Sequence, residues 1–332
     1  MGGGYWDAGT YASTTARKVS AGTSFGYDKG AKATGAYAAH ESLDPAKRNA
    51  EGILLKESRD SVEHPASVPI VVGFDATGSM GSIPIVAQKN LTKLFQLILD
   101  KEYVVDPQIA ITAYGDAYSD YVPLQISQFE SDNRIDTNLD NLFLEGNGGG
   151  NGGETQSLLW YYLANHVVTD AFEKRGKRGY LFIIADEIAL DLRTEHVTKA
   201  LKISADEVRG EDLTVAGVVQ HLKEQWDTYI ILEENFSAKR QGSRAFYTKL
   251  FGADHIIDAE GYDNIAEVIG GALGYLEGAA DADQLEDDLK AIGTSDALAR
   301  KTTNALARIT QATAAVNAEI ELAEDDEPLA RL

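Results

Sequence analysis

The chain has 332 residues, of which 44% are hydrophobic and 25% charged, and its formal net charge is −22 at pH 7. This composition is typical of a globular protein, and the negative charge argues against nucleic acid or an anionic membrane as a partner. The absence of cysteine excludes disulfides and thiolate metal sites. The sequence has no apolar run long enough to cross a bilayer and does not start like a signal peptide, so we expect a cytoplasmic protein.

Residues 1–40 are rich in Gly, Ala, Ser, Thr and Tyr and show no periodic apolar pattern. We therefore predict an arm that is extended or disordered on its own. Its aromatic residues would let it pack along its own domain or against a neighbouring subunit. Asp44-Pro45 is typical of a helix N-cap followed by proline at the first helical position, which predicts a helix over 44–59. We assign the arm and this helix to residues 1–65.

Residues 66–279 alternate between apolar strands and amphipathic helices, the pattern of an α/β fold with a doubly wound sheet. The short polar turn at 115–120 predicts an antiparallel hairpin at the edge of an otherwise parallel sheet. The strand at 180–185 is the most apolar and is expected to be central. The predicted strands cover 68–74, 108–114, 121–129, 180–185, 229–232 and 255–258, and the predicted helices cover 82–100, 135–144, 155–171, 194–203, 212–226, 243–251 and 263–276.

Residues 280–332 form an acidic extension with a predicted helix over 295–318. Its apolar residues form a narrow stripe that the polar Thr302 interrupts; the stripe consists of Leu298, Ala305, Leu306 and Ile309. This helix packs on the domain in one interpretation and mediates homo-oligomerisation in the other. The N-terminal arm is a second candidate for a contact between subunits.

Asp75, Thr77 and Ser79 follow directly after the buried strand at 68–74. Open α/β sheets bind ligands at the carboxyl ends of their strands. One carboxylate and two hydroxyls suit a hard divalent cation that keeps some of its waters. The structural alternative is that Thr77 or Ser79 caps the following helix.

The pattern Asp-x-Thr-x-Ser resembles the metal-ion-dependent adhesion site of von Willebrand factor A (vWA) domains, and the early hairpin matches the vWA arrangement. The segment from Lys56 to Gly81 is similar to a group of bacterial and phage vWA proteins, so a phage particle is the alternative location. The resemblance implies that a first loop supplies Asp75, Thr77 and Ser79, that a second supplies a threonine, and that a third supplies an aspartate. Asp186, directly after the strand at 180–185, matches the third loop.

The second loop is assigned to the glycine-rich segment 146–155, where glycines let the backbone approach an ion. Thr155 fits the family position best, and Asn151 and Glu154 remain alternatives. Asp116 is either an indirect ligand or a turn residue, and Glu187 stands next to Asp186. Because Asp75 and Asp186 are expected to end neighbouring strands, they would repel each other unless a cation intervened.

These residues favour a protein-binding module in which the carboxylate of a partner protein completes the coordination of the ion. The expected ion is Mg²⁺, with Ca²⁺ or Mn²⁺ as alternatives. The alternative function is a metal-assisted hydrolase with Glu187 or Asp116 as its base. The sequence contains no phosphate-binding G-x-x-x-x-G-K-[ST] loop, no zinc-like spacing of its six histidines and no dinucleotide-binding glycine pattern after a strand.

Overall fold

The computed structural model describes residues 6–21, 25–76, 93–145, 152–233, 239–259, 263–307 and 309. Eight strands are present in these residues: β1 (Lys56–Ser58), β2 (Val68–Asp75), β3 (Pro107–Tyr114), β4 (Leu124–Ile126), β5 (Val167–Thr169), β6 (Gly179–Ala185), β7 (Trp226–Glu233) and β8 (Ile256–Ala259). Six of them form one sheet in the order β4-β3-β2-β6-β7-β8, in which only β4 is antiparallel to its neighbour. The predicted fold class is confirmed, and β6 is central as expected.

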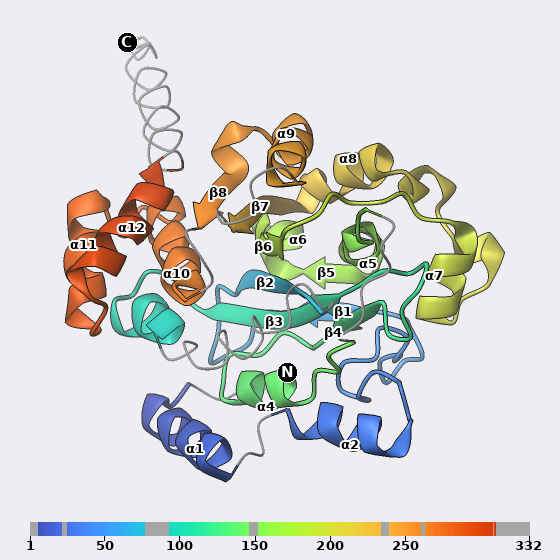
Figure 1. The fold of residues 1–332 in the computed structure, drawn as a ribbon, viewed down its shortest axis with the longest axis horizontal. Helices are drawn as coiled ribbons and strands as arrows, with labels where there is room; N and C mark the ends of the chain where they lie inside the picture. The colour runs from blue at the N-terminus through green and yellow to red at the C-terminus, as the bar shows by residue number, and fades with distance from the viewer. Residues whose placement is uncertain are drawn as a thin grey trace, which may run out of the picture.

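Helices cover both faces of this sheet (Figure 1). One face carries α10 (Ile265–Leu276), α11 (Ala282–Ala291), α12 (Asp296–Ala305) and the helical residues 93–100, which end in a π-helical turn. The other face carries α5 (Gln156–His166), α7 (Thr194–Leu201), α8 (Val215–Gln225) and α9 (Lys239–Phe251). The shorter helices α4 (Arg134–Asp140) and α6 (Asp170–Arg175) follow β4 and β5. Each face has its own apolar core, which is why the strands read as continuous apolar runs.

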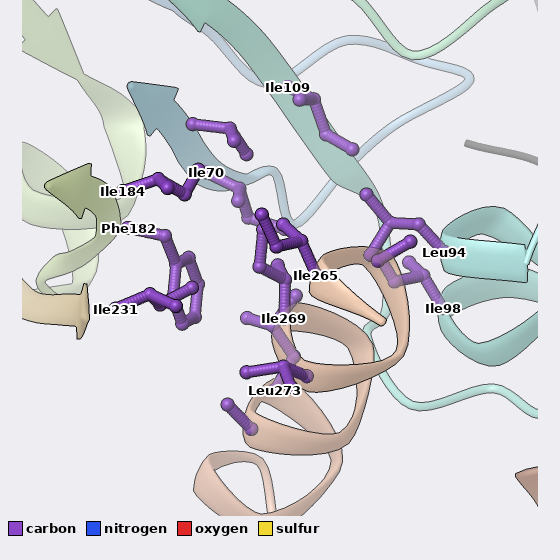
Figure 2. Packing of buried hydrophobic residues seen from close by; sticks show 14 of the residues in the cluster. Ile70, Leu94, Ile98, Ile109, Phe182, Ile184, Ile231, Ile265, Ile269 and Leu273 are labelled. Atoms are coloured by element: carbon purple, nitrogen blue, oxygen red, sulfur yellow. The ribbon is translucent and has the colours of Figure 1, made fainter. Parts of the chain in front are cut away.

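Alternate residues of the strands supply the two cores. Ile70 and Val72 of β2 point to the α10 face, whereas Val71 points to the α5 face. Figure 2 shows the first core, where Ile265 and Ile269 of α10 point toward the sheet. All of these side chains are buried, so this packing fixes the orientation of β2 and of the loop that follows it.

The N-terminal arm is helical, which corrects the prediction of an extended segment. It forms α1 (Ala8–Ala21) and α2 (Gly26–Thr34), beside α4 in Figure 1. Tyr11 is only 1% exposed, and Trp6 stacks on Phe95 with ring centroids 3.8 Å apart. Lys18 of α1 forms an ion pair with Asp136 of α4 at 2.6 Å. The arm therefore packs along its own domain, and aromatic contacts replace the regular apolar stripe that the sequence lacks.

The predicted helix at 44–59 is wrong. The Asp44 carboxylate accepts a hydrogen bond from the backbone nitrogen of Ala46 at 2.9 Å, which closes a turn instead of starting a helix. The chain then forms β1, which pairs in parallel with β5. The pairing of β1 with β5 also interrupts the predicted helix at 155–171: α5 ends at His166, and the β-branched residues 167–169 form β5.

The remaining elements differ mainly in length. The third predicted strand, 121–129, shortens to β4, and of the predicted helix at 82–100 only residues 93–100 belong to the described part. The predicted helix at 295–318 is described as far as residue 309, where Leu306 and Ile309 are buried against the domain. Thr302 is buried too, and its hydroxyl accepts a hydrogen bond from Asn264 at 3.0 Å. The interpretation of a helix packed on the domain therefore fits, while the predicted domain bounds remain predictions.

Gly179, the first residue of β6, is required by the packing of Trp226. A Cβ atom at position 179 would lie 2.6 Å from the buried indole ring. We expect Gly179→Ala to lower the free energy of unfolding by about 1–3 kcal/mol, because the ring has no room to move. Urea denaturation measures this loss. Gly242→Ala is the matched control: it lies in α9 with open space around it, and it should raise stability by up to about 1 kcal/mol. Equal stability of both variants would contradict the packing at Gly179.

Candidate functional site

The candidate site lies where β2, β3 and β6 end. Asp75 is the last residue of β2 and pairs with Tyr114, the last residue of β3, while Phe74 pairs with Ile184 of β6. Asp186 comes directly after β6. The expectation that Asp75 and Asp186 end neighbouring strands is confirmed. Asp75 is 1% exposed, so its carboxylate is withdrawn from bulk water.

Residues 152–155 are fastened to the loop after β6. Glu154 forms an isolated parallel bridge with Ala189, in which the Glu154 nitrogen donates to Ile188 O at 3.0 Å and Leu190 N donates to Glu154 O at 2.8 Å. Gly153 allows this contact, because a Cβ there would lie 2.7 Å from Ile188 O. The end of the predicted second loop therefore lies against the predicted third loop.

Thr155 holds the loop after β3. Its fully buried hydroxyl donates to Gly115 O at 2.9 Å and accepts from Ala117 N at 2.8 Å, and its backbone nitrogen also donates to Gly115 O. A hydroxyl has one hydrogen and two lone pairs, so these contacts leave a single lone pair for any ligand. Thr155 is thus a structural link between the second loop and the β3 loop, a role that its sequence position did not predict.

Asp116 is built into a tight turn. Its carboxylate accepts hydrogen bonds from Tyr118 N and from the Ser119 hydroxyl, both at 3.0 Å, and its backbone nitrogen donates to the Asp120 carboxylate at 2.7 Å. This fits the turn interpretation of Asp116. Asp120 is also buried, although nothing in the sequence pattern indicates a role for it. Burial raises the pKa of Asp120 to about 6, although the hydrogen bond from Asp116 opposes the shift.

Residues of two helices hold the backbone of the loop after β6. The Tyr247 hydroxyl of α9 donates to Glu187 O at 2.6 Å and accepts from the Gln156 side chain of α5 at 2.9 Å. The Ser243 hydroxyl donates to Asp186 O at 3.0 Å. These three supports were not predictable from the sequence, since nothing in the local pattern shows that α9 reaches the loop. They leave the side chains of Asp186 and Glu187 half-buried at the edge of the sheet.

We call the six carboxylates at these strand ends the acidic edge: Asp75, Asp116, Asp120, Glu154, Asp186 and Glu187. The negative charges of most of the others act on Glu154. It is 5% exposed, and burial together with the negative charges of Asp75, Asp116, Asp120 and Glu187 raises its pKa to about 9. Burial also raises the pKa of Tyr247 well above its ordinary value, and Asp186, Asp75 and Glu154 add to the shift. Several negative charges therefore act on the same small region.

The acidic edge fits a hard divalent cation in the chemistry of its donors, which are carboxylate oxygens. Glu154 Oε2 is buried and has no hydrogen-bond partner among the residues that the structure describes. Three of the predicted ligands, Thr77, Ser79 and Asn151, lie outside the described residues. Within the described part, no group of three or more His, Asp or Glu side chains is arranged to hold a metal ion.

No protein-family model and no curated protein matches the chain. Among solved structures, the pilus adhesin SpaC from Lactobacillus rhamnosus GG in its open conformation has a TM-score of 0.43 and 10% identity, covering 70% of this chain and 31% of the adhesin. A second structure of that adhesin scores 0.42, with 70% and 32% covered. Proximal thread matrix protein 1 from the mussel byssus scores 0.37 at 10% identity, with 64% and 48% covered.

The chain thus spans about a third of the adhesin, and similarity at this level carries no functional assignment. Within the described ranges, no helix combines the length and the apolar character needed to span a bilayer.

The raised pKa of Glu154 makes stability depend on pH. An acid whose pKa is higher in the folded than in the unfolded chain binds more protons when folded, so the free energy of unfolding falls as pH rises from about 4.5 toward about 9. Glu154→Gln removes this loss. In EDTA, we expect the variant to match the native chain at pH 5 and to exceed it by roughly 1–3 kcal/mol at pH 8.5.

Urea denaturation at both pH values measures the difference. Glu224→Gln is the control, because this carboxyl is exposed and lies near the end of α8, just before β7 begins, which is the opposite edge of the sheet. It should leave the pH dependence unchanged. The same pH dependence in Glu154→Gln and in the native chain would contradict a neutral, buried Glu154.

Proposed function

We propose that the chain is a protein-binding module that holds a divalent cation, with Mg²⁺ expected, at the acidic edge. A carboxylate from a partner protein would complete the coordination shell of the ion, which would then act as a bridge between the two chains. In this proposal Asp75, Thr77, Ser79 and Asp186 supply protein ligands, directly or through water. The vWA resemblance of the sequence suggests this set, and the ends of β2 and β6 are compatible with it.

The observation that carries the proposal is the environment of Glu154. Its carboxyl group is buried, and one oxygen has no hydrogen-bond partner within the described residues, although four other carboxylates act on it. Burying a polar oxygen without a partner costs free energy, and like charges add to that cost. A divalent cation would offset both terms, because it supplies positive charge and a direct partner for the oxygen.

The second-loop ligand of the proposal is Glu154 in preference to Thr155. The Thr155 hydroxyl already uses its hydrogen and one lone pair to hold Gly115 and Ala117. Glu154, in contrast, has an oxygen available at the bridge to Ala189. Asn151 stays a further candidate by its place in the glycine-rich loop. Thr155 then acts as a positioning residue that fixes the β3 loop beside the ion.

A metal-assisted hydrolase needs a base close to the same ion, and the two candidates differ. Both carboxylate oxygens of Asp116 accept hydrogen bonds inside their own turn, so this side chain already serves to hold the turn together. Glu187 is half-buried beside Asp186, and Tyr247 and Gln156 fix its position through its backbone oxygen. Glu187 is therefore the candidate base to substitute first if turnover is found.

Mg²⁺ should stabilise the native chain, and Asp75→Asn or Asp186→Asn should abolish that effect. Removing one carboxylate relieves repulsion, so we expect each variant to be at least as stable as the native chain in EDTA. An added ion at about 100 times its Kd would stabilise the native chain by about 2.7 kcal/mol. Thermal unfolding with EDTA and with Mg²⁺ measures both quantities.

Asp287→Asn is the control, because Asp287 is an exposed acid of α11. It should keep the full response to Mg²⁺. An equal Mg²⁺ response in the Asp75→Asn, Asp186→Asn double variant would overturn the site. A variant that merely misfolded would be recognised by its low stability in EDTA.

The bridging role predicts how partner binding responds to chelator and to salt. Proteins retained on the immobilised native chain should be released by EDTA but remain at about 0.5 M NaCl, where diffuse attraction to an acidic surface is screened. Asp75→Asn should lose the same proteins, whereas Asp287→Asn should keep them. Retention that ignores EDTA and Asp75→Asn would rule out a bridging ion. Mg²⁺-dependent hydrolysis of p-nitrophenyl phosphate that Asp75→Asn abolishes would replace the binding role with the hydrolase.

A further inference from the structure

A second polar site lies away from the acidic edge, between the loop before β1 and the region around α4. It is a pocket of about 390 Å³, which we call the basic pocket. Its lining includes Ser42, Lys47, Arg48, Lys56, Glu130 and Asn138. Three of these six side chains are cations and one is an acid, in a chain whose net charge is −22. The charged side chains that line this pocket are therefore mainly positive, whereas those of the whole chain are mainly negative.

Lys56 is the central feature of the basic pocket. It is the first residue of β1 and only 1% exposed, and its side chain lines the cavity. No carboxylate or hydrogen-bond acceptor in the described part of the chain pairs with its ammonium group. Burial and, to a smaller extent, the positive charge of Lys47 lower the pKa of Lys56 to about 8, against the attraction of Asp44. The ammonium groups of Lys47 and Lys56 thus repel each other, and the attraction of Asp44 offsets this repulsion only in part.

The carboxylates nearest to this pocket already have other partners. Glu130 forms an ion pair with Arg134 at 2.7 Å, and Asp44 forms one with Lys202 at 3.0 Å. A buried ammonium group without an opposite charge is unfavourable, and an anion that binds between the cations would compensate it. The charges of the pocket therefore call for an anionic ligand from outside the chain.

The walls of the basic pocket are held by hydrogen bonds. The carbonyl of the buried Leu43 accepts from Ile126 N at 2.9 Å, which attaches the loop to β4. Asn49 and Ile53 close the next turn, with Ile53 N donating to Asn49 Oδ1 at 2.8 Å. The Arg48 guanidinium donates to Gly52 O at 3.3 Å and keeps further N–H groups. The backbone that carries Lys47 and Arg48 is therefore held in place by hydrogen bonds.

We propose that the basic pocket binds a small molecule that carries a phosphate monoester. Lys47, Arg48 and Lys56 provide the positive charge for a dianionic group, and Asn138 and Ser42 provide neutral hydrogen-bonding groups. A single carboxylate would neutralise less of this charge. The volume is within the range of ordinary small-molecule sites, which leaves room for the organic part of the ligand. This inference is independent of the ion at the acidic edge.

Isothermal titration of the full chain with inorganic phosphate and with glycerol 3-phosphate, at constant ionic strength, tests the proposal. The monoester should bind more tightly than inorganic phosphate. Lys56→Met should weaken its binding at least about 10-fold, because it removes the buried charge and keeps a side chain of similar length. Lys249→Met, an exposed lysine of α9, is the control and should bind normally.

If Lys56→Met fails to fold, the double variant Lys47→Gln, Arg48→Gln takes its place, since both side chains are exposed. It should also weaken the binding of the monoester at least about 10-fold. No binding of glycerol 3-phosphate at millimolar concentration would overturn the proposal. So would binding that is equal in Lys56→Met and Lys249→Met, or inorganic phosphate that binds as tightly as the monoester.

Discussion

The parallel pairing of β2 with both β3 and β6 is the constraint on which the rest of the structure depends. Parallel strands end at the same edge, so every polar residue that follows one of them is brought to one place. Apolar cores on both faces prevent β2 from shifting its register, because a shift by one residue would turn Val71 and Val72 to the wrong faces. The accumulation of carboxylates at this edge is thus a consequence of the packing of strands, and the cost of their repulsion is borne by the two cores.

The sequence predicted those parts of the fold that depend on the local pattern of apolar and polar residues. The apolar runs predicted the strands of the large sheet, and the polar residues after them predicted the positions of Asp75 and Asp186. The wrong helix at 44–59 and the interrupted helix at 155–171 share one physical cause, which is pairing between distant segments. β1 and β5 are short, and each becomes a strand only because the other is beside it, so neither 44–59 nor 155–171 shows the interruption in its own pattern.

The same limit applies to the candidate site. The double use of the Thr155 hydroxyl depends on the loop after β3, and the support of Glu187 O by Tyr247 depends on where α9 lies. Lys56 shows this limit most clearly, because a lone lysine in a polar segment is expected to be exposed on the surface. Its burial follows from the alternation of side chains in β1, where Ser58 also points inward and donates to Gln108 at 2.8 Å. Only the pairing with β5 creates that inward face.

The chain has three tryptophans, and their placement lets their fluorescence distinguish the N-terminal helices from the rest of the domain. Trp160 and Trp226 are buried in the core on the α5 face, whereas Trp6 packs against the core on the opposite face of the sheet and stacks on Phe95. Release of the N-terminal helices would expose one indole to water and leave two in an apolar environment. The emission spectrum would then shift partly to the red while the far-ultraviolet signal of the sheet stayed constant. Detachment of α1 and α2 can thus be separated optically from the unfolding of the domain, without any added label.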